Sequence, residues 1–207
     1  EDFHGSIQTS FFDKSVPSHW GYRSQLLTNQ KHPAKKILTS IIQELDRCDG
    51  FFISVAFVTT SGIATIINKL KELENRGVQG EILVSQYLNF TQPEALKRLS
   101  QFKNIHLKVS TTGNAHSKAY IFQKQGHYSL IVGSSNLTAQ ALTTNQEWNL
   151  KVTALDSSGL VNEVLQQFRV DFNSAIDVTA SYIAEYESLY SRLLVHNKGE
   201  LPDEFKE

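Results

Sequence analysis

The sequence is short of the features that mark secreted or membrane proteins. Its one cysteine, Cys48, cannot form a disulfide within the chain, so a cytoplasmic location is expected and the thiol is interpreted as a bystander. The longest apolar run, FFISVAFV at 51–58, is too short to cross a bilayer, and the first residues lack a signal-sequence pattern, so no membrane partner is expected. Methionine is absent even at position 1, which suggests a segment of a longer polypeptide.

The chain also lacks an excess of charge of either sign. Its 20 Lys and Arg residues against 21 Asp and Glu give a net charge of -1, which excludes a generally basic surface that coats DNA. Any contact with nucleic acid must therefore be local. Two interpretations stay open for the denser basic positions, which are either solvated faces or a phosphate-binding patch: Lys31, Lys35, Lys36, Lys97, Arg98, Lys103 and Lys108.

Helix and strand signals alternate along the sequence. This alternation predicts an α/β fold with a mixed, mostly parallel sheet and helices on both faces. Apolar spacing, caps and glycines predict a helix that opens at Pro33 and ends at Gly50, a second from Thr60 or Ser61 to Gly77, and a third that opens on a Thr91 and Glu94 capping box and ends near residue 100. Strands are predicted after each of these helices, at 51–57, 81–85 and 105–109. A hairpin of strands 116–123 and 127–133, a strand at 145–153, and helices at 157–171 and 177–195 follow.

These elements define the expected domain boundaries. Residues 1–30 are polar and aromatic without a clear period and are interpreted as an arm that packs on the domain. Residues 31–195 form the domain itself. Residues 196–207, HNKGELPDEFKE, are polar and helix-breaking, as a linker to a further region would be.

The stretch AHSKAYIF, at 115–122, places a histidine and a lysine where an apolar strand begins. In an extended chain residues i and i+2 point the same way, so His116 and Lys118 share a face with Tyr120 and Phe122. The strand therefore aims an imidazole and an ammonium at one place.

The predicted hairpin brings the segment GSSN, at 133–136, beside this pair. With Gln125 as the centre of the turn, antiparallel pairing sets His116 opposite Ser134 and Lys118 opposite Val132. The segment is expected to bind a ligand through the close backbone approach that glycine permits, through two hydroxyls and through an amide. These groups belong to Gly133, Ser134, Ser135 and Asn136.

A carboxylate is expected at the same place. Glu147 follows Asn136 by only eleven residues and begins the strand after the hairpin. Lysine and asparagine suit the oxygens of a phosphate, a neutral imidazole can attack phosphorus, and a carboxylate can fix the imidazole's orientation. A single glutamate does not make a two-metal site, so neither a metal nor another cofactor is expected. The set predicts phosphoryl-transfer chemistry.

Each signal alone also has a plain structural interpretation. The spacing H-x-K recurs at His106 and His196, within an ordinary strand and in the polar tail. The histidine and lysine could be rim residues, the glycine and serine a turn, and Glu147 a solvent-facing strand residue. Of the three H-x-K patterns, only the one that begins at His116 is followed by G-S-x-N, and this combination favours the functional interpretation.

The combination HSK, GSSN and EWN closely resembles the active-site motif of the phospholipase D superfamily, in its nuclease branch. The longer run from KILTSIIQELDRCDGFFISVAFVTTSG through ILVSQYLNFTQPEAL to NQEWNLKV is similar to the nuclease-like domain found ahead of DEAD/DEAH-type helicases in restriction- or defence-like proteins. The resemblance covers roughly residues 25–170. Where the wider superfamily often has an aspartate six residues after the lysine, this chain has Lys124, and Glu147 matches the glutamate of related metal-independent nucleases.

The resemblance implies a phospholipase D-like α-β-α sandwich and a metal-independent phosphodiesterase that cleaves DNA through a phosphohistidine. His116 would attack, Lys118 and Asn136 would hold the phosphate, Ser134 would assist, and Glu147 would orient the histidine. Because the family's site needs two motifs and the chain has one, a homodimer is implied, with a helicase region possible on the same full-length chain. The alternatives are a catalytically silent dimerisation or DNA-binding module and a lipid phosphodiesterase.

Overall fold

Eight strands form one sheet at the centre of the protein. The computed structural model describes residues 23–86, 90–112 and 115–196, and the predictions for residues 1–22 and 197–207 lie outside them. The strands lie in the order β1-β7-β6-β5-β2-β3-β4-β8. Their bounds are β1 Gln25–Leu27, β2 Gly50–Val55, β3 Gln79–Ser85, β4 Ile105–Ser110, β5 Ala119–Lys124, β6 His127–Gly133, β7 Asn149–Leu155 and β8 Ile176–Asp177.

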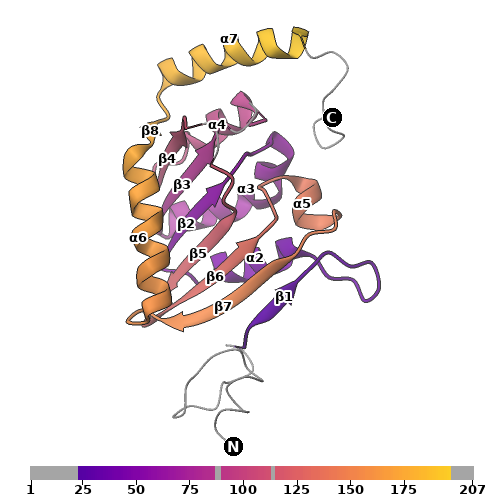
Figure 1. The fold of residues 1–207 in the computed structure, drawn as a ribbon, viewed down its shortest axis with the longest axis vertical. Helices are drawn as coiled ribbons and strands as arrows, with labels where there is room; N and C mark the ends of the chain where they lie inside the picture. Colours follow the sequence, from indigo (N-terminus) through magenta and orange to yellow (C-terminus); the bar gives the residue numbers. More distant parts are fainter. Residues whose placement is uncertain (1–22, 87–89, 113–114, 197–207) are drawn as a thin grey trace, which may run out of the picture.

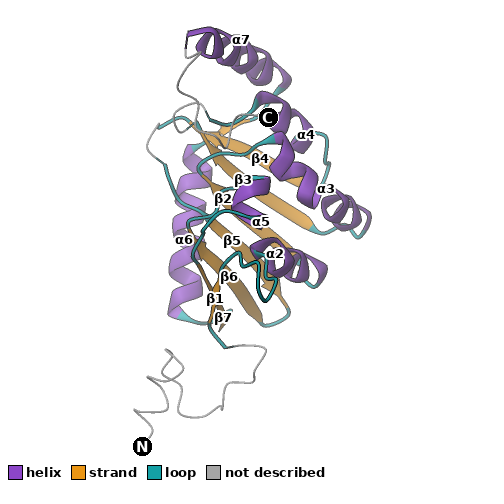
Figure 2. Cartoon of the chain, turned by 90° about the vertical axis from the view of Figure 1, so that its right-hand side faces the viewer, coloured by secondary structure: helices purple, strands orange, loops and turns teal. Residues whose placement is uncertain are grey.

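Helices cover both faces of this sheet, as predicted. Figure 2 shows α6 on one side and α2, α3, α4 and α5 on the other. Two apolar clusters correspond to these layers: one contains side chains of α2, α3 and α4, and the other contains Phe168 and Phe172 of α6. The helices are α2 Ile37–Asp46, α3 Thr60–Asn75, α4 Pro93–Leu99, α5 Ala139–Thr143, α6 Gly159–Ser174 and α7 Ala180–His196.

The sheet is mixed, but the expectation that it is mostly parallel was wrong. Among the described strands only β2 with β3 and β3 with β4 pair in parallel, whereas five pairings are antiparallel. Helices α3 and α4 provide the crossovers that parallel neighbours need. After β4 the chain passes to the other side of β2, where β5 pairs with β2 in the antiparallel direction, and a two-residue turn joins β5 to β6.

Most predicted elements are present with shifted ends. Helix α3 is capped one residue earlier than expected, because the Thr59 side chain accepts a hydrogen bond from the amide of Gly62 at 3.1 Å. The capping box at Thr91 does not form: α4 begins at Pro93, and the Thr91 hydroxyl donates instead to the carbonyl of Ser85 at 3.0 Å. In the part of the chain that the structure describes, no helix has the length and apolar character to span a bilayer.

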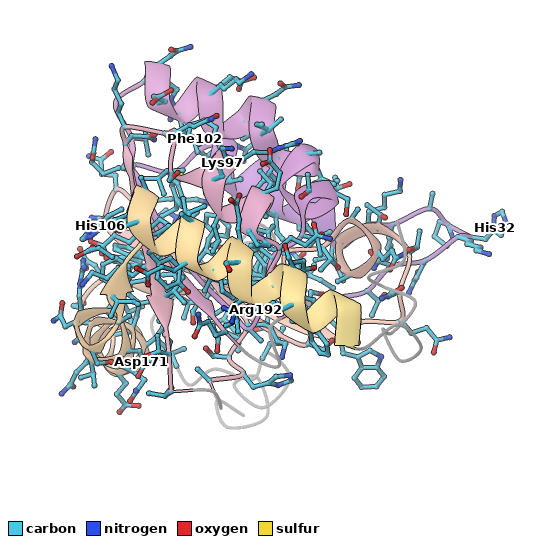
Figure 3. The ribbon with its side chains drawn as sticks, turned by 90° about the horizontal axis from the view of Figure 1, so that it is seen from above. His32, Lys97, Phe102, His106, Asp171 and Arg192 are labelled. Atoms are coloured by element: carbon cyan, nitrogen blue, oxygen red, sulfur yellow. The ribbon has the colours of Figure 1, made fainter. Side chains whose placement is uncertain are left out.

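Helix α7 closes one end of the sandwich. Seen from above, it crosses the end of the sheet that lies near α4 (Figure 3). The Tyr186 hydroxyl donates to the carbonyl of Thr91 at 2.8 Å, and the Gln86 side chain donates to the Tyr182 hydroxyl at 2.6 Å. These bonds tie the helix to the connection between β3 and α4.

Candidate active site

The polar residues singled out in the sequence gather at one edge of the sheet. His116 and Lys118 directly precede β5, the segment 133–136 begins with the last residue of β6, and Glu147 precedes β7. Because β5, β6 and β7 are consecutive antiparallel neighbours, the start of β5, the end of β6 and the start of β7 lie at the same edge. The topology therefore brings all three segments together.

The register of the hairpin differs by one residue from the prediction. Ala119 pairs with Val132, and the amide of Gly133 donates to the carbonyl of Lys118 at 3.2 Å, so Lys118 faces Gly133. The turn consists of two residues, Gln125 and Gly126, and Gly126 has a φ of 76°. Its centre therefore falls between these residues rather than on Gln125.

Lys118 and His116 are in direct contact. The ammonium nitrogen of Lys118 lies 2.8 Å from Nδ1 and 2.9 Å from Nε2 of the His116 ring, and it donates to the His116 carbonyl at 2.9 Å. Lys118 is buried, whereas His116 is exposed. Desolvation and the neighbouring Lys118 charge lower the pKa of His116, which favours the neutral imidazole that can act as a nucleophile.

Burial lowers the pKa of Lys118, and the negative charge of Glu147 opposes this effect. Glu147 therefore helps to keep the ammonium protonated. Its carboxylate accepts a short hydrogen bond from the hydroxyl of Ser134. The same hydroxyl accepts a hydrogen bond from the amide of Trp148 at 3.1 Å, so Ser134 connects the end of β6 to the start of β7.

Asn136 is held by the end of β2. Its side-chain oxygen accepts hydrogen bonds from the amides of Ala56 at 3.1 Å and Phe57 at 3.3 Å. The residue is 8% exposed. With the oxygen engaged in this way, the NH₂ group is left as the donor available for an anion, since within the described residues it has no acceptor.

Ser135 belongs to the framework under the site. It is fully buried, its hydroxyl accepts a hydrogen bond from the Asn149 amide group at 2.8 Å, and its carbonyl accepts one from Tyr120 at 3.1 Å. Its expected role as a ligand-binding hydroxyl receives no support from these contacts. Asn149 was missed in the sequence, although it shares a strand face with Glu147 at a spacing of two.

A second framework contact was also missed. The hydroxyls of Ser54 and Ser117 lie 2.7 Å apart and link the end of β2 to the segment between His116 and Lys118. Ser117 follows directly from the H-S-K pattern, but its partner lies 63 residues away. No local signal identifies such a partner.

Gly133 has a packing role that differs from the one expected. A Cβ atom there would lie 2.2 Å from the carbonyl oxygen of Trp148 and 2.6 Å from the Cα of Asn149. The missing side chain therefore permits the close approach of β6 and β7 rather than that of a ligand.

Lys124 does not bear on the orientation of His116. It ends β5, six residues beyond Lys118, and an extended chain of that length spans roughly 20 Å. Its ammonium pairs with the buried carboxylate of Glu44, which also pairs with Lys151. The lysine that replaces the aspartate of the wider superfamily is thus part of a largely buried group of ion pairs with Glu44 of α2.

The other described H-x-K pattern has no part in the site. His106 lies on β4 toward α6 (Figure 3), where its Nε2 is 2.6 Å from Asp177 and its ring meets Phe172 edge-on at 5.0 Å. Lys108 lies over the same Phe172 ring at 5.2 Å. Within the described residues, no group of three or more His, Cys, Asp and Glu residues is arranged to hold a metal ion.

Comparisons with known proteins identify similar folds. The structure resembles "a phospholipase D family member, Nuc from Salmonella typhimurium" (17% identity, 76% of this chain and 98% of that one, TM-score 0.61) and "NucT from Helicobacter pylori" (17%, 76% and 99%, 0.59). It also resembles phosphatidylserine synthase from Haemophilus influenzae (12%, 87% and 48%, 0.59). At these identities the likeness shows the fold, and the predicted fold class is confirmed.

No curated protein sequence matches the chain. Residues 22–176, however, match the family described as "Cardiolipin synthase, PLD-like domain". This match spans most of the chain and includes every residue of the candidate site, and it confirms the predicted enzyme class, a phosphodiesterase. The chain belongs to the phospholipase D-like family.

Proposed function

We propose that this protein hydrolyses DNA phosphodiester bonds without a metal ion, through a phosphohistidine formed on His116. The observation that carries the proposal is the contact between the His116 imidazole and the buried Lys118 ammonium. The imidazole is favoured in its neutral form, and a positive charge lies within hydrogen-bond distance of the atom that attacks. A phosphate bound beside them would present its phosphorus to the nucleophile and its oxygens to the positive charge.

In the first step, a ring nitrogen of His116 attacks phosphorus and a P–N bond forms as the P–O bond to the leaving strand breaks. Lys118 and the Asn136 NH₂ group stabilise the non-bridging oxygens. The leaving oxygen takes a proton from a second histidine. In the second step that histidine removes a proton from water, the hydroxide oxygen bonds to phosphorus, and the P–N bond breaks to restore His116.

The second histidine comes from a second copy of the chain in this proposal. The sequence has one H-x-K segment that is followed by G-S-x-N, so one chain supplies half of a two-histidine site. A homodimer with a two-fold axis through the site would set the two His116 rings on opposite sides of one phosphorus.

The remaining residues act around this pair. Ser134 and Glu147 are hydrogen-bonded to each other, and the carboxylate supports the charge of Lys118. Glu147 therefore acts on the phosphate-binding ammonium, in addition to the expected orientation of the imidazole. Gly133 and Ser135 shape the segment on which Ser134 and Asn136 stand.

The choice of DNA rests on the resemblance of the motif segments to the nuclease branch. The fold also occurs in a phosphatidylserine synthase, so a lipid phosphodiester is the second candidate substrate. A helicase region on the same full-length protein, and cytoplasmic location, are further parts of the proposal that rest on the same resemblance.

The test is cleavage of labelled DNA in excess EDTA by the wild type and by His116→Ala. His106→Ala is the matched control, because it removes a histidine from an H-x-K pattern outside the site. We expect cleavage by the wild type and the control, and none by His116→Ala. A transient protein–DNA adduct that is stable to base and labile to acid would identify the P–N bond.

Four results would count against the proposal. Cleavage that EDTA abolishes, or that survives His116→Ala, would exclude this mechanism. Tight DNA binding that His116→Ala leaves unchanged, together with no cleavage, would favour the catalytically silent binding module. Turnover of a phosphatidyl substrate in place of DNA would favour the lipid phosphodiesterase.

A further inference from the structure

The loop that follows β1 leaves the sheet at the edge that holds the candidate site. Strand β1 pairs with β7 in the antiparallel direction, with Leu27 opposite Asn149, so the end of β1 lies beside the start of β7. The start of β7 is also where Glu147 of the candidate site lies. Figure 1 shows the loop, residues 28–36, projecting past the sheet below α5. We call residues 28–36 the basic loop.

The basic loop is held at both of its ends. Gln30 and Lys35 exchange two backbone hydrogen bonds, at 2.9 and 3.0 Å, which close a turn over residues 31–34. The Asn29 side chain donates to the carbonyls of Ala141 and Asn145, each at 2.9 Å, and its oxygen accepts a hydrogen bond from the first amide of α2 at 3.0 Å. These bonds fix the loop against the connection between α5 and β7, which leads into the candidate site.

The basic loop carries charge of one sign only. Its sequence, TNQKHPAKK, contains three lysines and no acidic residue, and the neighbouring segment 139–146, AQALTTNQ, contains no charged residue. Lys31, Lys35 and Lys36 are exposed. Within the described residues, no carboxylate forms an ion pair with any of the three. In a chain whose net charge is -1, the loop is therefore a local and uncompensated excess of positive charge.

This charge faces the solvent at a short distance from the candidate site. Figure 3 shows His32 at the far end of the loop, away from the sheet and its helices. Strand β1 is the third neighbour of β5 in the sheet, and at about 4.8 Å per strand the loop lies roughly 15 Å along the edge from the start of β5, where His116 stands. One strand of B-DNA carries a phosphate about every 3.4 Å of axis, so this separation corresponds to about four base pairs.

We propose that the basic loop binds the phosphate backbone of the DNA substrate beside the scissile phosphate, through Lys31, Lys35 and Lys36. Contacts of lysine with phosphates fix the position of a protein on a duplex and carry no sequence information. The loop would thus position DNA of any sequence on the edge of the sheet where His116 lies. This inference rests on the proposed function in its choice of DNA as the partner.

A lipid surface is the other polyanion that a basic loop can meet. Segments that lie on membranes combine basic residues with large apolar side chains that enter the acyl boundary. Between Lys31 and Lys35 the loop has only His32, Pro33 and Ala34, none of which is a large apolar residue. The composition of the turn therefore favours a polyanion that is bound through charge alone, as the backbone of DNA is.

Three exposed lysines at the opposite edge of the sheet provide a matched control. Lys97 lies in the last turn of α4, Lys103 precedes β4, and Lys71 lies in the second half of α3. Helices α3 and α4 run from the ends of β2 and β3 to the starts of β3 and β4. The end of β2 lies at the edge of the candidate site, where it binds Asn136, so the starts of β3 and β4 lie at the other edge.

The test is the affinity of the full 207-residue chain for a labelled DNA duplex, measured by fluorescence anisotropy in EDTA over a series of salt concentrations. His116→Ala is the background, so that binding is measured without cleavage. Replacing Lys31, Lys35 and Lys36 together by Gln should reduce the slope of log affinity against log salt by about three and weaken binding at least tenfold at about 0.1 M salt. Replacing Lys71, Lys97 and Lys103 together by Gln changes the net charge equally and should leave the slope unchanged.

An unchanged slope in the loop variant would overturn the inference, and so would an equal loss in both triple variants, which would assign the effect to net charge. Loss of binding to phosphatidylglycerol vesicles, with DNA affinity unchanged, would assign the loop to a lipid surface instead. Melting temperatures show that the variants are folded, and Lys31→Gln alone, with an expected change in slope of about one, replaces the triple variant if that does not fold. Because the background does not cleave, failure of the proposed chemistry would leave these affinities unchanged, whereas failure of this inference would leave cleavage by the wild type intact.

Discussion

The ammonium nitrogen of Lys118 lies 2.8 Å from Nδ1 of His116, so two basic groups meet at one point of the sheet edge. Both have lowered pKa values, His116 through desolvation and the Lys118 charge, and Lys118 through desolvation. Protonation of the imidazole would place two positive charges in contact. The lysine charge therefore selects the neutral histidine as well as attracting phosphate.

This relationship predicts the pH dependence of cleavage. Because the neutral imidazole attacks, activity should fall as the pH drops through the pKa of His116, and the midpoint of that fall should lie below about pH 6.5, the ordinary value for histidine. The pH profile of kcat/KM measures it. In Lys118→Met, the His116 pKa followed by NMR titration should rise toward the ordinary value, although cleavage is lost.

The control for this titration is Lys108→Met, which removes the lysine of the other described H-x-K pattern. Its ammonium lies over the Phe172 ring, and its removal should leave the His116 titration unchanged. A His116 pKa that is the same in wild type and Lys118→Met would show that the contact has no electrostatic effect.

A second prediction distinguishes the role of the Asn136 side-chain oxygen from that of its NH₂ group. Asn136→Asp keeps an oxygen for the amides of Ala56 and Phe57 but replaces the NH₂ donor with a negative charge. We expect a loss of kcat of about 10²- to 10³-fold or more, as for removal of a single oxyanion donor. The melting temperature should stay close to that of the wild type.

Asn136→Ala removes both the oxygen and the NH₂ group and is compared with Asn136→Asp. It leaves two backbone amides without their acceptor, which should cost about 1–3 kcal/mol of unfolding free energy in addition to the activity. Equal stability of the two variants, measured by urea denaturation, would contradict the structural role of the side-chain oxygen.

The sequence was sufficient for the fold class but not for the proportion of parallel strands. Local signals identified the helices between β2, β3 and β4, and the parallel pairings there follow from the crossovers. The position of β5 beside β2 depends on which strand occupies the centre of the sheet. No local pattern encodes that choice, because it is decided by the packing of the whole apolar face.

The site was predictable because its residues lie close together in the sequence. His116 with Lys118, the G-S-S-N segment and Glu147 come from neighbouring antiparallel strands, so short-range spacing brings them to one edge. The error of one residue in register arose from the two-residue turn at Gln125 and Gly126. Contacts between distant segments, such as Asn136 with the end of β2, had no counterpart in the sequence.

A third prediction concerns two glycines in the first turns of helices. A Cβ atom on Gly62 of α3 would lie 1.9 Å from the carbonyl oxygen of Leu137, next to the site segment, whereas one on Gly159 of α6 would meet nothing within 4 Å. Gly62→Ala should therefore destabilise the fold by about 1–3 kcal/mol, as overpacking does. Gly159→Ala should be neutral or stabilising by up to about 1 kcal/mol.

Urea denaturation of both variants measures this difference, and DNA cleavage gives a second readout. Because the clash of Gly62→Ala would displace the segment after Asn136, its activity should fall more than that of Gly159→Ala. Equal stabilities would show that α3 can move away from Leu137 without cost.

A fourth prediction addresses the buried charges at the other end of the sheet. Glu44 is 5% exposed and pairs with Lys124 and Lys151. Burial alone raises the pKa of Glu44, but the hydrogen bonds and charges of the two lysines outweigh it and lower the pKa below the ordinary value. Glu44→Ala should cost about 3–5 kcal/mol, because two largely buried ammonium groups lose their partner.

The matched control is Glu94→Ala, which breaks an exposed pair with Arg98 one helical turn away and should cost no more than about 0.5 kcal/mol.

The lowered pKa of Glu44 also predicts how its contribution to the free energy of unfolding changes with pH. Because the folded pKa of Glu44 is lowered, its contribution is complete above the unfolded pKa, near 4.5, and is lost as the pH falls through the folded pKa. The difference in unfolding free energy between wild type and Glu44→Gln should therefore shrink as the pH falls below 4.5. A difference that stays constant across that range would mean that the lysines do not stabilise the ionised carboxylate.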